Sequence, residues 1–141
     1  AGAGQVSQPD GALDDFYAAY VEAALWSTND ESTPEGGVPF DQNYGPDDIH
    51  PDSREKMLKD CQRFLYKNRA HIKPEYCTRG TGEYSVYAQT GHDFWLTRCH
   101  HGAGFWDGDW KEPHASKLTE SAHAFGEVWL TLGDDKKIHV T

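Results

Sequence analysis

The chain has 141 residues, of which 37% are hydrophobic and 26% are charged, and its formal net charge is −10. This length suits a single domain with one core, and no run of residues is apolar enough to span a membrane. Because the start of the chain carries neither the basic nor the apolar region of a signal peptide, and because excess carboxylates repel phosphate backbones and membrane surfaces, we expect a soluble intracellular protein that contacts neither nucleic acid nor membrane directly.

The N-terminal part of the sequence predicts a tail followed by a helix. The chain begins Ala1-Gly2-Ala3-Gly4, so we interpret residues 1–10 as a tail or cloning remnant and residues 11–141 as one domain. Apolar residues recur with helical spacing over residues 11–27, which predicts a helix with Asp10 as its N-cap. Its apolar face consists of Leu13, Phe16, Tyr17, Tyr20, Val21, Ala24 and Leu25.

A long loop and a second helix are expected next. Residues 28–49 are rich in Pro and Gly and show neither a helical nor a strand period. Loops of this length are uncommon in compact domains, and we expect an ordered one, anchored by Val38, Phe40 and Tyr44. The second helix is predicted to have Pro51 in its first turn and to end near residues 68–70.

Two hairpins are predicted in the second half of the chain. Residues 93–98 have strand propensity, and a short connection leads to residues 103–107, which indicates a β-hairpin. Residues 118–125 favour a short helix, and alternation over residues 128–132 and 138–140 predicts a second hairpin. We therefore expect an α+β fold with two N-terminal amphipathic helices, a short third helix and a small antiparallel sheet built from two hairpins.

The two faces of the first predicted hairpin determine where Trp95 and Trp106 lie. If its phenylalanine and leucine side chains occupy the buried face, Trp95 and Trp106 share the opposite face. Unless helices cover this face, the two indoles form an exposed aromatic patch suited to binding. Arg98 is expected to pair with Asp107 or Asp109 across the hairpin.

The negative charge is concentrated in the first 60 residues, which hold 13 acidic and 3 basic side chains, whereas residues 61–141 hold ten of each. This excess of negative charge in the first 60 residues either promotes solubility or forms a docking face for a basic partner. The candidate docking carboxylates are Asp14, Asp15, Glu22, Asp41, Asp47 and Asp48.

Histidines and carboxylates also cluster within residues 92–109. Imidazole and carboxylate groups are ligands of Zn and Mn, so a metal-dependent hydrolase or nuclease is one interpretation. Its candidate ligands are His92, Asp93, His101 and Asp107. Neighbouring side chains on a strand point to opposite faces, and no HExxH or CxxC signature is present, so a structural role without a cofactor is favoured.

The sequence gives little indication of a catalytic cysteine or a phosphate-binding loop. The three cysteines form no CxxC pair, so free thiols are expected, and Cys99 beside His100 is too local to act as a papain-like pair. The Gly-rich segment over residues 79–82 favours an ordinary turn, with a phosphate-binding loop as the alternative. No catalytic residue is assigned, and a binding protein is favoured over an enzyme.

The sequence GHDFWLTR at residues 91–98, followed by HGAGFWD at residues 101–107, resembles a block of an uncharacterised family of small acidic tailed-phage and prophage proteins. In that family pattern Asn-Gly stands where this chain has Cys99-His100, so the resemblance gives those two side chains no role. It implies a phage origin and brings no established activity. The leading hypothesis is an accessory protein of the host cytoplasm that binds a basic host or phage macromolecule and inhibits a nucleic-acid-binding or defence protein. A virion component is the other interpretation.

Overall fold

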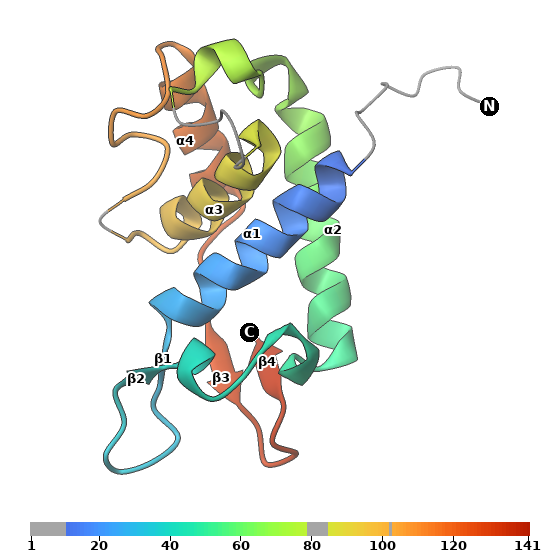
Figure 1. The fold of residues 1–141 in the computed structure, drawn as a ribbon, viewed down its shortest axis with the longest axis vertical. Coiled ribbons are helices and arrows are strands. Elements are labelled where there is room, and N and C mark those ends of the chain that lie inside the picture. Colours follow the sequence, from blue (N-terminus) through green and yellow to red (C-terminus); the bar gives the residue numbers. More distant parts are fainter. Residues whose placement is uncertain (1–10, 79–84, 102) are drawn as a thin grey trace, which may run out of the picture.

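The structure is a computed structural model that describes residues 11–78, 85–101 and 103–141. These ranges contain four α-helices and two antiparallel sheets of two strands each (Figure 1). The helices are α1 (Ala12–Ser27), α2 (Pro51–Lys67), α3 (Val86–Arg98) and α4 (His114–Ala124). The strands are β1 (Asn29–Asp30), β2 (Val38–Pro39), β3 (Leu130–Leu132) and β4 (Ile138–Val140). The predicted α+β class is confirmed, with four helices instead of three.

The predicted first helix is present as α1, which packs most extensively against α3 and also contacts α2 (Figure 1). Gly11 precedes it with a φ of 83°, a left-handed conformation that glycine adopts without strain. Phe16 and Tyr20 are fully buried on its inner face, as the helical spacing indicated. The second predicted helix is α2, with Pro51 in its first turn and the His50 imidazole as N-cap, accepting from the amide of Asp52 at 3.1 Å.

The predicted loop at residues 28–49 contains local structure. Strands β1 and β2 pair with each other, and two 3₁₀ turns follow, η1 (Phe40–Gln42) and η2 (Pro46–Asp48). Phe40 is buried and Tyr44 half-buried, as expected of anchors, whereas Val38 is exposed and does not anchor the loop. Residues 69–71 and 74–76 form two further 3₁₀ turns, η3 and η4.

The predicted hairpin over residues 93–107 is wrong, because residues 93–98 belong to helix α3. Ser85 caps this helix by accepting from the amide of Ala88 at 3.1 Å. Ten of its 13 residues are buried, so the helix has no polar face that would produce a helical period in the sequence. The aromatic residues of α3 have a high strand propensity, and this led to the incorrect prediction of a strand. The Gly-rich turn over residues 79–82 lies outside the described residues.

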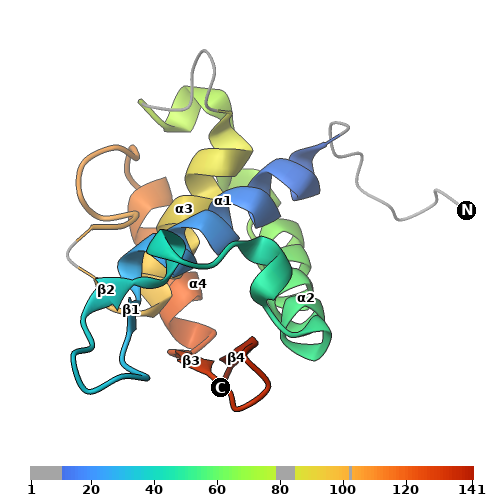
Figure 2. The same ribbon diagram turned by 60° about the horizontal axis from the view of Figure 1, so that its bottom comes forward.

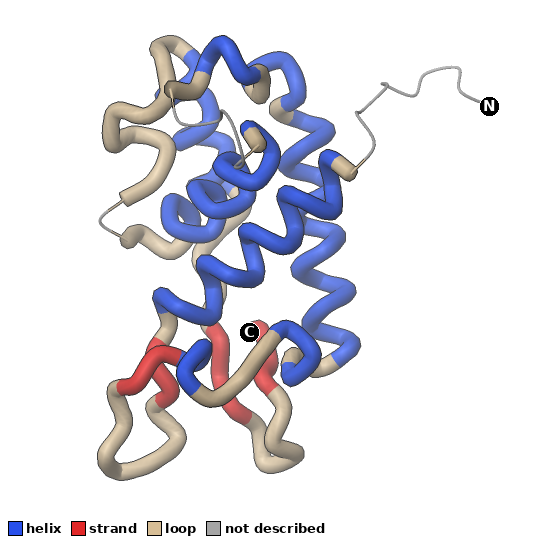
Figure 3. The backbone as a smooth tube through the Cα atoms, viewed as in Figure 1, coloured by secondary structure: helices blue, strands red, loops and turns tan. Residues whose placement is uncertain are grey.

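The C-terminal prediction is closer to the structure. The expected short helix over residues 118–125 is α4, which begins four residues earlier. Strands β3 and β4 form the predicted second hairpin, with Leu130 opposite Val140 and Leu132 opposite Ile138. The two sheets are separate, so the hairpins do not build one sheet. Figures 2 and 3 show both at the same end of the helical body.

Aromatic side chains from several helices meet in the core. Phe64 of α2 stacks on Phe94 of α3 with ring centroids 4.1 Å apart, and Phe16 of α1 contacts both rings at 6.1 Å. Phe105, from the segment after α3, also stacks on Phe64, with ring centroids 5.7 Å apart. Among the described residues, no helix combines the length and apolarity needed to cross a membrane.

Candidate functional site

A groove of about 410 Å³ lies between α1 and the segment that carries η1 and η2, which pack against each other. Its lining is predominantly apolar. The α1 wall is formed by Tyr17, Ala18, Val21 and Leu25, and the opposite wall by Tyr44, Gly45 and Pro46. Val21 and Leu25 are buried at the floor, whereas Ala18 is exposed at the edge. An apolar groove of this kind can hold an apolar side chain of a partner.

Carboxylates from both walls border this groove. Glu22 of α1 and Asp41 of η1 belong to its lining, and both are exposed. Asp14 lies on the same stripe of α1, two turns before Glu22, and Asp47 follows Pro46 in the other wall. Glu22 and Asp41, two of the six predicted docking carboxylates, therefore line one groove, which we call the acidic groove, and Asp14 and Asp47 lie on the elements that form its walls.

The remaining two predicted carboxylates have local partners. Asp48 accepts from the amide of Gly45 at 2.8 Å and so fixes the turn of the groove wall. Asp15 accepts from the Ser85 hydroxyl at 3.0 Å and ties the start of α1 to the start of α3. The groove floor cannot be recognised from the sequence, because Val21 and Leu25 have the same helical spacing as core residues.

One cation lies near the acidic groove. Arg54 is 4.0 Å from Asp47, and its charge partly opposes the effect of burial, which raises the pKa of Tyr17. Asp47 is fully exposed and the Arg54 side chain is 41% exposed, so the pair contributes little stability. The border of the groove is thus negative, with Arg54 beside it.

The predicted metal ligands are only partly brought together. His92 Nδ1 lies 3.0 Å from Asp93 Oδ1. Asp107, in contrast, accepts from the amide of Gly104 within its own turn, and the amide of His101 donates to the Leu96 carbonyl at the end of α3. Over residues 11–78, 85–101 and 103–141, no group of three or more His, Cys, Asp or Glu side chains is placed to hold a metal ion.

Asp93 instead joins α3 to the segment that follows it. Its Oδ2 accepts from the Trp110 indole at 2.8 Å and from the Gln89 amide at 2.9 Å, and the side chain is almost fully buried. Each bond satisfies a donor that would otherwise be buried without a partner. Asp93 therefore holds the segment after α3 against the helix.

Arg98 is the centre of a buried polar network and does not pair with Asp107 or Asp109 as the hairpin required. The side chain is 2% exposed and donates to Asp60 Oδ2 at 2.9 Å and to the Tyr20 hydroxyl at 3.0 Å. It also donates to the carbonyls of Phe125 and Gly126 at the end of α4. The guanidinium thus connects α1, α2 and α3 and caps the C-terminus of α4.

The two predicted binding tryptophans do not form one patch. Trp95 is 1% exposed and donates from its indole to the Ser27 hydroxyl at 2.9 Å. Trp106 is 54% exposed and lies beside Glu112 and Glu120 in a separate shallow groove. Of these two tryptophans, Trp106 is the one that is exposed to a partner.

Cys61 and Cys99 are free thiols. Burial raises the pKa of the Cys99 thiol to about 11, and its Sγ donates to the Val128 carbonyl. Burial, with the charge of Asp60, also raises the pKa of Cys61 well above its ordinary value. Both groups stay protonated near neutral pH, so neither is an activated nucleophile.

Because of the histidine pair His71 and His114, we expect the protein to be less stable in mild acid. His71 and His114 face each other with their Nδ1 atoms 2.9 Å apart, so in the neutral pair the Nδ1–H of one ring donates to the Nδ1 of the other. Tyr76 stacks on His114 with ring centroids 3.6 Å apart. Burial, together with the charges of His114 and Lys117, lowers the pKa of His71 from 6.5.

Because the folded state holds the pKa of His71 below its unfolded value, the unfolded chain binds more protons as the pH falls through 6.5. The free energy of unfolding should therefore decrease from pH 7 towards pH 5, and His71→Gln should reduce this slope. Urea denaturation across this range measures it. His101→Gln is the control, and an unchanged slope in His71→Gln would contradict the assignment.

No model of a protein family matches the chain, and no curated protein or solved structure is significantly similar to it.

Proposed function

We propose that the chain is a phage-encoded accessory protein that binds a basic surface of a host or phage macromolecule through the acidic groove. The observation that carries this proposal is the groove itself, where carboxylates from α1 and η1 border an apolar floor. The phage origin rests on the residue block at 91–98 and 101–107.

The two parts of the groove have different roles in binding. An apolar side chain of the partner that fills the space between Val21 and Tyr44 supplies affinity by leaving water. Glu22 and Asp41 attract lysine and arginine around that anchor, which raises the rate of association and selects a basic partner. The net charge of −10 extends this attraction beyond the groove.

A partner with this chemistry resembles the surface that a nucleic-acid-binding protein offers to phosphates. Such surfaces combine arginine and lysine with exposed aromatic or apolar groups. Occupation by an acidic protein would exclude nucleic acid from them. We therefore propose inhibition of a host nucleic-acid-binding or defence protein as the consequence of binding.

Capture from a lysate of the bacterial host at about 50 mM and about 500 mM salt tests the proposal, since rim charges are screened at the higher concentration. The wild-type chain should retain a basic protein at low salt and lose most of it at high salt. Glu22→Lys with Asp41→Lys should weaken capture at least about tenfold. Ala18→Trp, which fills the exposed edge of the groove without changing its charge, should also weaken it.

The matched control is Glu35→Lys with Asp134→Lys, which makes the same charge change at exposed positions away from the groove. Capture that survives in the groove variants, or that is lost equally in the control, would reject this groove as the binding site. Capture that is equal at both salt concentrations would reject charge as its basis.

A further inference from the structure

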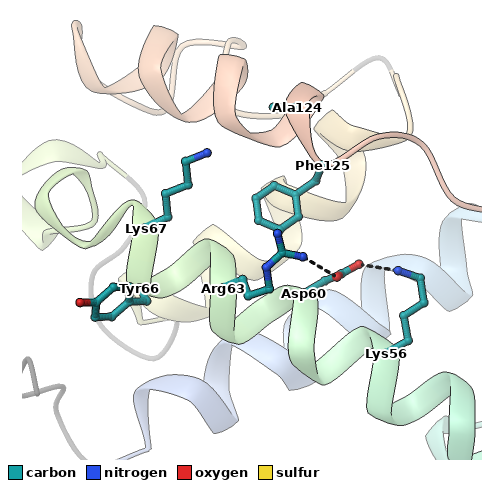
Figure 4. Close-up of a pocket in the computed structure, with 7 residues that line it drawn as sticks. All are labelled: Lys56, Asp60, Arg63, Tyr66, Lys67, Ala124 and Phe125. Atoms are coloured by element: carbon teal, nitrogen blue, oxygen red, sulfur yellow. Dashed lines mark hydrogen bonds and ion pairs between the residues drawn. The ribbon is translucent and has the colours of Figure 1, made fainter.

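A second pocket, of about 400 Å³, has the opposite charge to the acidic groove. It lies between α2 and the C-terminal end of α4 (Figure 4). Its lining residues are Lys56, Asp60, Arg63, Tyr66, Lys67, Ala124 and Phe125. Three cations against one carboxylate give this lining a formal charge of +2, in a protein whose net charge is −10.

The helical repeat places these charges together. Positions 56, 60, 63 and 67 are separated by four, three and four residues, so they occupy one face of α2. Asp60 lies at the centre of this row, where its Oδ2 accepts from Lys56 at 3.2 Å and from the buried Arg98 at 2.9 Å. The single carboxylate of the pocket is therefore already neutralised.

Two cations remain for a ligand. Arg63 is 4.0 Å from Asp60 Oδ1, beyond hydrogen-bond distance, and its side chain is 73% exposed. Lys67 forms no ion pair with any residue of the described ranges and extends towards the pocket in Figure 4. A phosphate group, which carries close to two negative charges at neutral pH, matches this pair.

The pocket also offers an aromatic wall. The Phe125 ring is half-buried and lies under the Arg63 guanidinium, with the carbon of that group 5.2 Å from the ring centroid. A planar ring of a ligand can stack on an aromatic face or on a guanidinium plane. The chemistry at this end of the pocket suits a ring attached to the phosphate.

The surrounding charge selects for small ligands. A nucleic-acid strand would extend into the field of the acidic half of the chain, whereas a ligand within a pocket of about 400 Å³ experiences the local positive charge. At physiological salt the Debye length is about 8 Å, so distant carboxylates are screened and the adjacent cations are not.

From these observations we infer that the pocket between α2 and α4 binds a small phosphorylated ligand with a planar ring, of the mononucleotide class. Arg63 and Lys67 hold the phosphate, and the exposed face of the Arg63 guanidinium, whose other face lies on Phe125, receives the ring. This site is separate from the acidic groove, and its test does not depend on the proposed function.

Calorimetric titration with AMP, adenosine, ribose 5-phosphate and inorganic phosphate tests the site. AMP should bind more tightly than ribose 5-phosphate or inorganic phosphate, which lack the ring, and than adenosine, which lacks the phosphate. Arg63→Gln and Lys67→Gln should each weaken AMP binding about tenfold, because each removes a charge-assisted contact. Amide shifts at residues 124–126 on adding AMP would locate the ligand.

Lys59→Gln is the matched control, because Lys59 is an exposed lysine of the same helix that pairs with Glu55 outside the pocket. Thermal denaturation of each variant establishes that it is folded. Absence of AMP binding at millimolar concentration, or an equal loss in Lys59→Gln, overturns the site. Equal affinity for AMP and inorganic phosphate overturns the role of the ring, and equal affinity for AMP and adenosine overturns that of the phosphate.

Discussion

Replacement of Arg98 by leucine is expected to lower the free energy of unfolding by about 3 to 5 kcal/mol. This is the cost of removing one partner of a buried ion pair and leaving the other charge buried. The change leaves the Asp60 carboxylate, whose side chain is only 9% exposed, with Lys56 as its remaining partner in hydrogen-bond range. The carbonyls of Phe125 and Gly126 also lose their donor at the end of α4. Urea denaturation measures the loss.

Two comparisons separate this mechanism from a general effect of losing an arginine. Arg63→Leu, at an exposed position with a distant partner, should change the free energy of unfolding by less than about 1 kcal/mol. Adding Asp60→Leu to Arg98→Leu removes the unpaired charge and should recover part of the loss. Equal effects of Arg98→Leu and Arg63→Leu would contradict the network.

Replacement of Gly91 by alanine is expected to lower the free energy of unfolding by about 3 kcal/mol. In the middle of a helix, alanine in place of glycine normally raises the free energy of unfolding by about 1 kcal/mol. The opposite sign follows from the close approach of α3 to α1. A Cβ at Gly91 would overlap the carbonyl oxygen of Phe16, a backbone atom that cannot rotate away. The two helices would have to separate, and the aromatic contacts of Phe16 would loosen.

The control for this prediction is Gly45→Ala. Gly45 has a φ of −128°, and no heavy atom lies within 4 Å of the place that an alanine Cβ would occupy, so alanine fits without strain. Its free energy of unfolding should stay within about 0.5 kcal/mol of the wild-type value. A Gly91→Ala protein as stable as the wild type would show that α1 and α3 do not meet at this glycine.

The helices that the sequence predicts well are those with one buried face. In α1, Phe16 and Tyr20 alternate with exposed carboxylates, so the helical period is visible. Helix α3 is buried on nearly all sides, and the run from Asp93 to Arg98 has no such period. Its aromatic content then favours a strand, although tertiary burial determines a helix.

Residues 91–98 and the segment that follows them specify packing. Gly91 allows α3 to approach α1, and the Thr97 hydroxyl accepts from the Phe105 amide at 3.1 Å where the following segment folds back. Asp93 fixes the same segment through Trp110. These long-range partners could not be assigned from the sequence, since each depends on the path of the chain after α3.

The sequence predicts the charge of the candidate site better than its shape. Glu22 and Asp41 stand out because the front half of the chain is so acidic, and the structure places both at one groove. The apolar floor depends on how the segment with η1 and η2 packs on α1, which no local pattern indicates. The sequence does not predict the basic pocket, because Lys56, Arg63 and Lys67 meet Ala124 and Phe125 only through the tertiary fold.

Titration of the ¹⁵N-labelled chain with a short amphipathic peptide of lysine and leucine tests the central claim, that the acidic groove accepts a basic segment with an apolar anchor. We predict saturable amide shifts confined to α1 between Tyr17 and Leu25 and to residues 41–46, and none with a peptide that has glutamate for lysine. Shifts that do not saturate, that spread over all the exposed carboxylates, or that are equal for both peptides would contradict it.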